Sequence, residues 1–414
     1  MTNYSYADYI SFLLYQKKIY QLSHFRCVFM KKNQTNLYNM VLVRHGGEIG
    51  IKSRKTRSRM IKLLNDTIKY KTQHLNVESV IHKYTRTLVT SSEFSPTKIA
   101  KYIANHICGV DSTSPVQFIE IKTLDTILSS GVNYALTFLE KDDSFGFKVR
   151  RTGNHSFSSM ELASLLGSKV LKESTIKGFN NNVNLTNPDY LFQLEIKYDY
   201  CFLFHNSFSG LNGLPQGSQG LILANIRSWT PDYLAACMML RRGAKIIPIF
   251  FSSNKQKKLR KIQTFFDEVR LGSKERDFLV DLEKDFLKKW KEKISQIELC
   301  QACHFFTELV SKYLYESEED YLGIVNGTSL KDVSSNFLKK LDVLPNIPIH
   351  RPYLLNFDKN IPEPLKFMLE NSENNISCCE IQEKRFFSSE NNLSDDILKE
   401  IDSDAKIIVE KLVS

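Results

Sequence analysis

The sequence predicts an α/β protein of two or three domains, and three observations lead to that prediction. The chain has 414 residues, which is more than a single hydrophobic core usually serves. A strand–helix–strand–strand–helix order between residues 40 and 107 indicates a small ferredoxin-like unit. Between residues 221 and 251 a strand, a helix and an apolar strand follow one another, which favours a parallel, doubly wound sheet.

The ferredoxin-like unit opens at Met40, where five mostly apolar residues predict a short strand that Gly46 and Gly47 end. Apolar residues at helical spacing predict a helix over 57–67. Strands are expected at 77–81 and 86–90, and a helix is expected at 96–107. Residues 1–39 carry no clear pattern and are interpreted as an N-terminal extension, with Met40 as an alternative start of translation.

A second α/β unit follows, with a strand at 145–150, a helix at 158–174 and a hairpin of strands 190–196 and 201–205. A glycine-rich connector over 210–220 leads to the strand 221–224, the helix 232–242 and the strand 246–251. The charged stretch 255–293 is expected to be helical with a solvated face. A last helix is expected over 394–412.

The bulk composition favours a globular protein with a polyanionic partner. Hydrophobic residues make up 42% of the chain, and the net charge is +10 with a pI near 9.0. Such a charge suits nucleic acid, because each phosphate contact releases counterions. The most apolar early stretch, residues 9–15, is too short for a membrane span and lacks the pattern of a signal peptide. A cytoplasmic, reducing location is therefore expected, with no membrane partner.

Cysteine placement separates two groups of residues. Eight cysteines in a chain of 414 residues are too few for a disulfide scaffold. The single cysteines in apolar surroundings are expected to be small core residues: Cys27, Cys108, Cys201 and Cys237. Two close pairs remain as candidates for chemistry, namely Cys300 with Cys303 and Cys378 with Cys379.

A basic segment at residues 148–155 has the composition of an RNA-binding surface. Lys148 and Arg150 share one face of the predicted strand, and Arg151 follows them. Asn154 and His155 lie in the same cluster, where asparagine and serine offer hydrogen bonds to phosphate or ribose. From these residues alone, a solvated basic loop is the favoured interpretation. A second basic patch lies on the first predicted helix and includes Arg57, Arg59 and Lys62.

Three segments together resemble the tRNA 4-thiouridine synthetase family. They are residues 43–53, which read Val-Arg-His-Gly-Gly-Glu-Ile-Gly-Ile-Lys-Ser, residues 147–159 together with 185–189, and residues 213–220. The similarity runs from about residue 40 to beyond residue 379. It implies an N-terminal extension at 1–39, a ferredoxin-like domain at 40–97, a THUMP domain at 98–209 and a PP-loop ATPase-like domain at 210–414. A rhodanese domain is not expected.

The resemblance also implies a partner and a reaction. Transfer RNA is the expected partner, held by the first two domains, and the reaction is sulfur transfer to the uridine at position 8. The expected RNA-binding residues are Lys52, Arg57, Arg59, Lys148, Arg150, Arg151, Asn154 and His155. Whether the protein pairs with a second copy of itself or with a partner synthetase is left open.

The expected ATP-binding turn departs from the family pattern. A working PP-loop reads Ser-Gly-Gly-x-Asp-Ser, and its glycines let backbone amides point at pyrophosphate. The corresponding turn here, residues 225–232, contains no glycine and carries Trp229 and Pro231. Thr230 and Pro231 instead suit the start of a helix. Weakened or absent ATP binding is therefore predicted. The nucleotide-binding candidates that remain are Arg227, Ser228, Gly327 and Asn336.

The sulfur-handling residues match the family better. By resemblance, Cys303 and Cys379 are the catalytic candidates, and Cys300, Cys303 and Cys379 would hold an iron–sulfur cluster. Zinc is the alternative metal, since close cysteine pairs also suit a tetrahedral site. A redox disulfide, or cysteines without a role, are the remaining interpretations.

Two functions follow from these features. The first is a tRNA sulfurtransferase with an atypical loop, and the second is a non-catalytic, tRNA-binding paralogue that has lost ATP binding and assists an active synthetase. A role as a sulfur carrier in the thiamine pathway is a more remote third interpretation.

Overall fold

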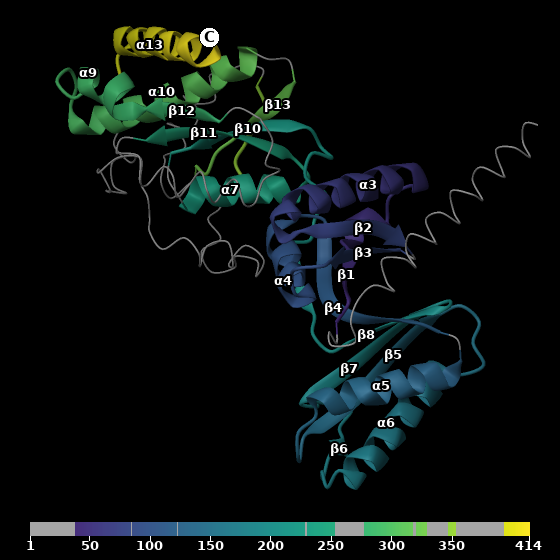
Figure 1. The fold of residues 1–414 in the computed structure, drawn as a ribbon. Coiled ribbons are helices and arrows are strands. Elements are labelled where there is room, and N and C mark those ends of the chain that lie inside the picture. The colour runs from purple at the N-terminus through teal and green to yellow at the C-terminus, as the bar shows by residue number, and fades with distance from the viewer. Residues whose placement is uncertain are drawn as a thin grey trace, which may run out of the picture.

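The computed structural model describes residues 38–83, 85–121, 123–227, 230–252, 277–317, 320–328, 347–352 and 393–414. Two sheets organise this part of the chain, one of nine strands and one of five. Figure 1 shows the five-stranded sheet at one end of the molecule and the nine-stranded sheet extending through the other two units.

The first half of the nine-stranded sheet is the predicted ferredoxin-like unit. Its described elements are β1 (Met40–His45), α2 (Gly47–Gly50), α3 (Arg54–Lys71), η1 (Gln73–Leu75), β2 (Val77–Lys83), β3 (Arg86–Ser91) and α4 (Pro96–His106). Side chains alternate along β1, so Val41 and Val43 face the helices and bury against Leu64 and Ile103. The strand–helix–strand–strand–helix order predicted from the sequence is confirmed.

Strand β4 (Val110–Glu120), which the sequence reading missed, joins this unit to the next. Residues from Val110 to Val116 pair with β1, while residues 117–120 pair with β8. The sequence did not predict this strand because it contains Pro115, and proline has no backbone N–H to donate to a β-ladder. Here it lies between the residues of β4 that pair with β9 and those that pair with β8, so its missing N–H costs no bond to those strands.

The second half of the sheet carries two helices on one face. Its elements are α5 (Leu124–Phe138), β5 (Ser144–Thr152), α6 (Ser159–Ile176), β6 (Asn182–Val183), β7 (Tyr190–Lys197), β8 (Tyr200–Phe204) and β9 (Phe208–Ser209). The predicted hairpin of β7 and β8 is antiparallel, as expected, and β5 lies parallel to β7. A capping box of Ser158 and Glu161 starts α6. Helix α5 was not predicted.

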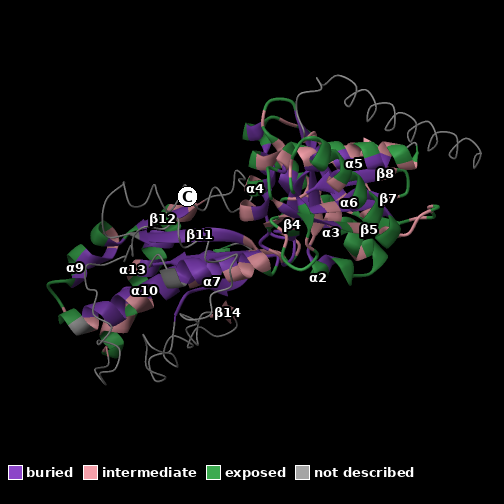
Figure 2. Ribbon diagram, turned by 90° about the horizontal axis from the view of Figure 1, so that it is seen from below, coloured by how far each residue is buried: buried purple, intermediate pink, exposed green. Residues whose placement is uncertain are grey.

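The five-stranded sheet is parallel throughout its described strands, which confirms the predicted doubly wound architecture. Its order is β12 (Phe278–Asp281), β11 (Lys245–Ser252), β10 (Leu221–Ile226), β13 (Tyr321–Val325) and β14 (Ile349–His350). Helix α7 (Thr230–Arg241) covers one face, while α10 (Gln296–Ser317) and α13 (Asp395–Val413) cover the other (Figure 1). Leu223 accordingly packs toward α10, and its neighbours Ile222 and Ala224 pack toward α7. Figure 2 shows that buried residues dominate this unit.

One expectation for the charged stretch 255–293 is wrong. Its residues 255–276 lie outside the described part of the chain, but residues 278–281 form β12 rather than a helix. Phe278 and Val280 alternate with exposed residues and are buried beside β11. The π-helix η2 (Glu283–Leu287) and α9 (Lys288–Trp290) follow. Alternation of apolar side chains and the open edge of β11 outweigh the helical preference of the surrounding lysines and glutamates.

The glycine-rich connector is fixed by close backbone contacts. Gly213 has a φ of +77°, and a Cβ at this position would lie 2.1 Å from the carbonyl oxygen of Arg241 at the end of α7. Only glycine tolerates both the positive φ and the close approach of that carbonyl oxygen. The connector therefore seats the five-stranded sheet against the ferredoxin-like unit. The predicted domain limits at residues 39, 97 and 209 stay predictions.

His45, at the end of β1, is held as a neutral ring. The Thr87 hydroxyl donates to the Asn65 side-chain oxygen at 2.6 Å, so Nε2 of His45 donates to that hydroxyl at 2.9 Å. The His45 ring stacks on His82 with ring centroids 5.3 Å apart. Burial, His82 and Arg86 together lower the pKa of His45 to about 4.

This geometry predicts a loss of stability in mild acid. The unfolded chain protonates His45 near its ordinary pKa of 6.5, whereas the folded protein does so only near 4. The stabilisation is therefore complete above pH 6.5 and declines as the pH falls toward 4, by an amount on the order of 2 kcal/mol. Urea unfolding at pH 7.5 and 4.5 should show a smaller acid loss in His45→Gln than in the wild type. Equal losses in the two proteins would contradict this account.

Candidate functional site

The strand order of the five-stranded sheet marks where a ligand would be expected. The chain moves outward in one direction from β10 to β11 and β12, and in the other direction to β13 and β14. Ligands of such sheets bind at the carboxyl ends of the strands where the direction changes. Arg227 directly follows β10, and residues 326–328 directly follow β13. These two strand ends therefore form the candidate nucleotide site.

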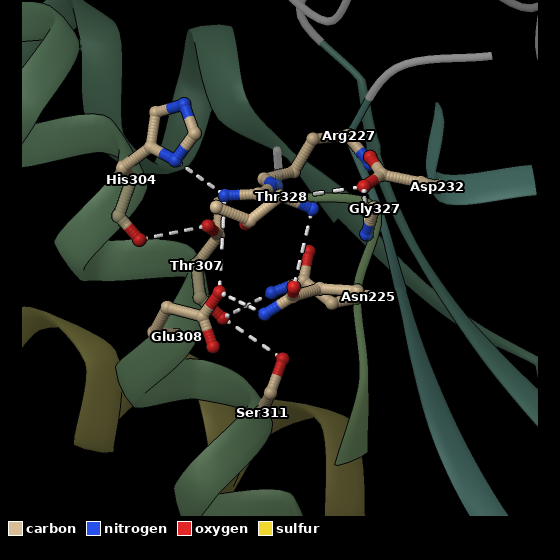
Figure 3. Close-up of polar contacts among 10 residues, drawn as sticks. Asn225, Arg227, Asp232, His304, Thr307, Glu308, Ser311, Gly327 and Thr328 are labelled. Carbon is tan, nitrogen blue, oxygen red and sulfur yellow. Dashed lines mark hydrogen bonds and ion pairs between the residues drawn. The ribbon is translucent and has the colours of Figure 1, made fainter. Parts of the chain in front are cut away.

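Arg227 is buried there among acceptors supplied by α7, by α10 and by the segment after β13 (Figure 3). Its Nη2 donates to the Thr328 hydroxyl at 3.1 Å and lies 3.6 Å from a carboxylate oxygen of Asp232. Its Nη1 donates to Nδ1 of His304 and lies 3.8 Å from Oε1 of Glu308. Because the guanidinium can only donate, Nδ1 of His304 carries no proton in this arrangement.

Asp232 fills the role that a bound anion would have at this turn. Its carboxylate accepts the backbone N–H of Arg227 at 2.7 Å and that of Gly327 at 2.8 Å (Figure 3). Backbone amides at the start of a helix, next to a strand end, are the groups that hold phosphate in nucleotide-binding loops. Here both amides are taken by a side chain of the first turn of α7.

Glu308 brings a second carboxylate into the same interior. It lies on α10, its side chain is 1% exposed, and its Oε1 accepts from the Asn326 amide at 2.9 Å. Burial raises the pKa of Glu308 above its ordinary value, while Arg227 and Arg351 act in the opposite direction. A phosphate chain brought to these strand ends would meet two carboxylates and a guanidinium that is already paired. The described residues therefore do not fit ATP phosphates.

The structure brings together only part of the predicted nucleotide site. Arg227 and Gly327 meet through Asp232, as described above, whereas Ser228 and Asn336 lie outside the described residues. Sequence reasoning did not find the partners of Arg227, namely Asp232, Glu308 and Thr328. The acid at 308 within an otherwise largely apolar helical stretch was the available signal, because a buried carboxylate needs a partner.

The cysteine pair of α10 is buried and stands on one side of the helix. Cys300 is 9% exposed and Cys303 is 7% exposed, and three residues separate their positions. Two thiols one turn apart suit a shared metal as a partial ligand set. Within the described ranges no group of three or more ligating side chains is found. Cys27, Cys378 and Cys379 lie outside those ranges, so the proposed third ligand is not described.

Three of the cysteines expected in the core are found there. Cys108, Cys201 and Cys237 are buried. Burial raises the pKa of the Cys108 thiol to about 11 and that of Cys201 to about 12, and it also raises the pKa of Cys237. Such thiols stay protonated and unreactive at neutral pH.

The predicted RNA-binding residues lie on two exposed surfaces of the nine-stranded sheet. Lys148, Arg150 and Arg151 are exposed at the carboxyl end of β5, and Asn154 is exposed in the loop that follows. His155 is half-buried, and its Nε2 donates to the carbonyl oxygen of Tyr198 at 2.9 Å. The ring of His155 therefore fixes the loop to the β7–β8 turn.

The second surface lies at the start of α3. Lys52, Arg57 and Arg59 are exposed there, and Nη1 of Arg57 donates to the carbonyl oxygen of Gly50 at 3.2 Å.

None of the helices in the described part of the chain combines the length and apolar character that a membrane span requires.

Comparison with known proteins identifies the family. The model of the THUMP domain matches residues 122–206, the model of the ThiI ferredoxin-like domain matches 40–114, and the model of the thiamine biosynthesis protein (ThiI) matches 217–370. A probable tRNA sulfurtransferase of Sulfurisphaera tokodaii is 30% identical over 335 residues, which are 77% of this chain and 83% of that protein. This chain belongs to the tRNA sulfurtransferase family. A second member of the tRNA sulfurtransferase family, from Methanocaldococcus jannaschii, is 28% identical over 77% of this chain and 85% of its own length.

Solved structures show the same fold as this tRNA sulfurtransferase family member. The crystal structure of a 4-thiouridine synthetase–RNA complex with bound ATP superimposes with a TM-score of 0.67 at 18% identity and covers 91% of this chain and 97% of that one. The structure of PH1313 from Pyrococcus horikoshii gives a TM-score of 0.58 at 21% identity, covering 81% of this chain and 98% of that one. The predicted combination of ferredoxin-like, THUMP and PP-loop-type domains is thereby confirmed.

The Arg227 contacts predict a large stability loss for Arg227→Met. The substitution keeps most of the side-chain volume but leaves the Asp232 and Glu308 carboxylates buried without their central cation. Breaking a buried pair in this way costs about 3–5 kcal/mol. The midpoint of urea unfolding should fall accordingly, whereas Arg242→Met, at an exposed position of the same unit, should change stability by roughly 0.5 kcal/mol or less. Similar midpoints for the two variants would refute the assignment.

Proposed function

We propose that this protein binds tRNA through its ferredoxin-like and THUMP units and serves sulfur transfer to the uridine at position 8. The observation that carries the proposal is the exposed group of cations at the carboxyl end of β5, namely Lys148, Arg150 and Arg151. They lie in the THUMP unit, within a sheet that is continuous with the ferredoxin-like unit. The relatives named as tRNA sulfurtransferases support the same substrate.

The direction of the β5 side chains supports RNA binding rather than a role in the core. Phe147 and Val149 face the core formed with α5 and α6, so Lys148 and Arg150 face the opposite side of the sheet. Among the described residues, α5 and α6 of the THUMP unit lie on the other side, which leaves room here for a large, folded polyanion. A pair of exposed cations two residues apart along a strand lies about 7 Å apart, close to the spacing of successive phosphates.

For the sulfur chemistry we propose Cys303 and Cys379 as the reactive cysteines. With Cys300 they form the proposed ligand set of an iron–sulfur cluster, which would supply sulfide, and zinc is the alternative metal. The burial of Cys300 and Cys303 on one side of α10 supports a shared ligand role for these two residues. Metal and acid-labile sulfide analysis of the anaerobically purified protein distinguishes iron–sulfur from zinc, and protein without either would refute both.

Removing the β5 cations should weaken tRNA binding. In Lys148→Ala/Arg150→Ala, affinity for an unmodified tRNA should fall at least tenfold near 0.1 M salt. The slope of log affinity against log salt should also become shallower by roughly 1.5, because about two phosphate contacts are lost. Fluorescence anisotropy with labelled tRNA measures both quantities. The matched control is Lys169→Ala/Lys172→Ala, two exposed lysines of α6. Equal losses in the two double variants, or a wild type that ignores tRNA, would contradict the proposal.

The Asp232 contacts favour a second candidate function, a tRNA-binding paralogue that does not use ATP and assists an active synthetase. Asp232 accepts the two amides of Arg227 and Gly327, and Arg227 is paired with carboxylates. A phosphate would have to displace a carboxylate from both amides while approaching Glu308. In this candidate the RNA-binding surface works without adenylation of the uridine.

Calorimetric titration with MgATP separates the two candidates. The second candidate predicts no saturable heat of binding up to about 1 mM MgATP. A phosphate that has to displace the Asp232 carboxylate and approach Glu308 would bind with a dissociation constant above that concentration. Saturable binding in the micromolar range would instead support the sulfurtransferase. The titration is performed with and without tRNA, because a tRNA-induced rearrangement of the β10–α7 turn would reveal itself as ATP binding in the complex alone.

A further inference from the structure

We propose that the RNA surface of this protein extends across the joint between the THUMP and ferredoxin-like units, along a cationic ridge that also presents an exposed tyrosine. We define this junction ridge as Lys83, Arg86, Arg150, Lys197 and Tyr198. The inference rests on the proposed tRNA binding and names four contact residues that the sequence reading did not single out. The phosphates of the RNA would bind the cations, and one unpaired base would stack on the tyrosine ring.

At the joint between the two units, a buried carboxylate of the THUMP unit forms ion pairs with two arginines of the ferredoxin-like unit. Glu195 of β7 is 4% exposed at its side chain, and Oε1 lies 2.8 Å from Nε of Arg44 on β1. Its Oε2 lies 3.3 Å from Nε of Arg86 on β3. Arg44 also donates to the Ser114 hydroxyl at 3.0 Å and packs 4.7 Å above the Phe204 ring. These contacts fix the edge of the ferredoxin-like unit beside β7.

The register of β5 and β7 places several cations on the same face of the sheet. Arg150 of β5 stands opposite Glu195, and Thr152 stands opposite Lys197. Nζ of Lys197 donates to the Thr152 hydroxyl at 3.0 Å. Burial, with Arg86 and Arg150 nearby, lowers the pKa of Lys197, while Glu195 acts in the opposite direction. Like charges from two units are thus held close together, an arrangement that a polyanion would relieve.

The hairpin between β2 and β3 adds to the ridge from the ferredoxin-like side. Nζ of Lys83 lies 4.3 Å from the centre of the Tyr200 ring, on the first residue of β8. The acids close to this surface in sequence or register are Glu120 and Asp199, in addition to Glu195. Glu195 and Arg86 pair within the joint, so the remaining cations Lys83, Arg150 and Lys197 outnumber the two exposed acids.

Tyr198 occupies the tip of the β7–β8 turn in a strained conformation. Its φ is +53°, which is unfavourable for a bulky side chain, and its side chain is among the exposed aromatic groups at 53% exposure. The carbonyl oxygen of Tyr198 accepts from His155, and its ring packs beside Gly153. Strain of this kind at an exposed aromatic residue points to a role in binding. A ring beside several cations matches the way single-stranded bases are held.

The salt dependence of tRNA binding tests the cations of the ridge. Lys197→Ala and Arg86→Ala are each expected to reduce affinity and to make the slope of log affinity against log salt shallower by roughly 0.7–0.9. Lys172→Ala is the control, because Lys172 is exposed on α6 about 20 Å along the helix from its start near the carboxyl end of β5. Thermal unfolding verifies that the variants fold, and the neutral substitution Arg86→Gln, which keeps a hydrogen-bond donor, replaces Arg86→Ala if the latter does not fold.

Stacking has a different signature, which Tyr198 variants should reveal. Tyr198→Ala is expected to weaken binding about tenfold without changing the salt slope, and Tyr198→Phe is expected to bind like the wild type. Wild-type affinities and slopes in the Lys197, Arg86 and Tyr198 variants, with a wild type that binds tRNA, would overturn the ridge alone. A wild type that binds no tRNA would overturn the proposed function as well. Equal competition by duplex DNA would show a general polyanion surface and would also overturn the ridge.

Discussion

The arrangement of the RNA-facing units depends on one strand that hydrogen-bonds in two directions. β4 pairs with β1 through its first residues and with β8 through its last ones, so one strand carries a ladder of each unit. Both ladders satisfy backbone groups that would be costly to leave unpaired. The shared strand therefore joins the two units into one platform for a ligand larger than either.

The charged joint at Glu195 acts on the same platform. A carboxylate at 4% exposure is unfavourable to bury, and its contacts with Arg44 and Arg86 offset that cost. Both arginines come from the ferredoxin-like unit, and the carboxylate comes from β7. The pairing thus specifies one relative placement of the two units rather than adding much net stability. It also positions Arg86 beside Lys197, where the proposed ridge begins.

In the five-stranded sheet, charge is buried for a different reason. The strand order creates a place for a ligand at the ends of β10 and β13. In the absence of a ligand or a side chain, the backbone N–H groups of Arg227 and Gly327 would lack an acceptor there. Asp232 accepts those amides, Arg227 neutralises it, and Glu308 and His304 complete the group (Figure 3). These side-chain contacts hold the ends of β10 and β13 against the first turn of α7.

The sequence by itself determined the three-domain architecture and supplied the candidates for the binding and sulfur-handling residues. Alternating apolar residues defined β1 and the faces of β5, and the glycine at 213 and the cations at 148 and 150 were recognisable because local spacing controls backbone conformation and strand faces. Only the tertiary structure decided which distant residues meet. Strand β4 was missed because of Pro115, and strand β12 was missed because of its charged neighbours. Residue spacing gave no indication that Glu195 lies between Arg44 and Arg86. It also gave no indication that Asp232 accepts the Gly327 amide. Such contacts depend on how strands far apart in the chain are brought into register, and that is fixed by packing over the whole sheet rather than by any local pattern.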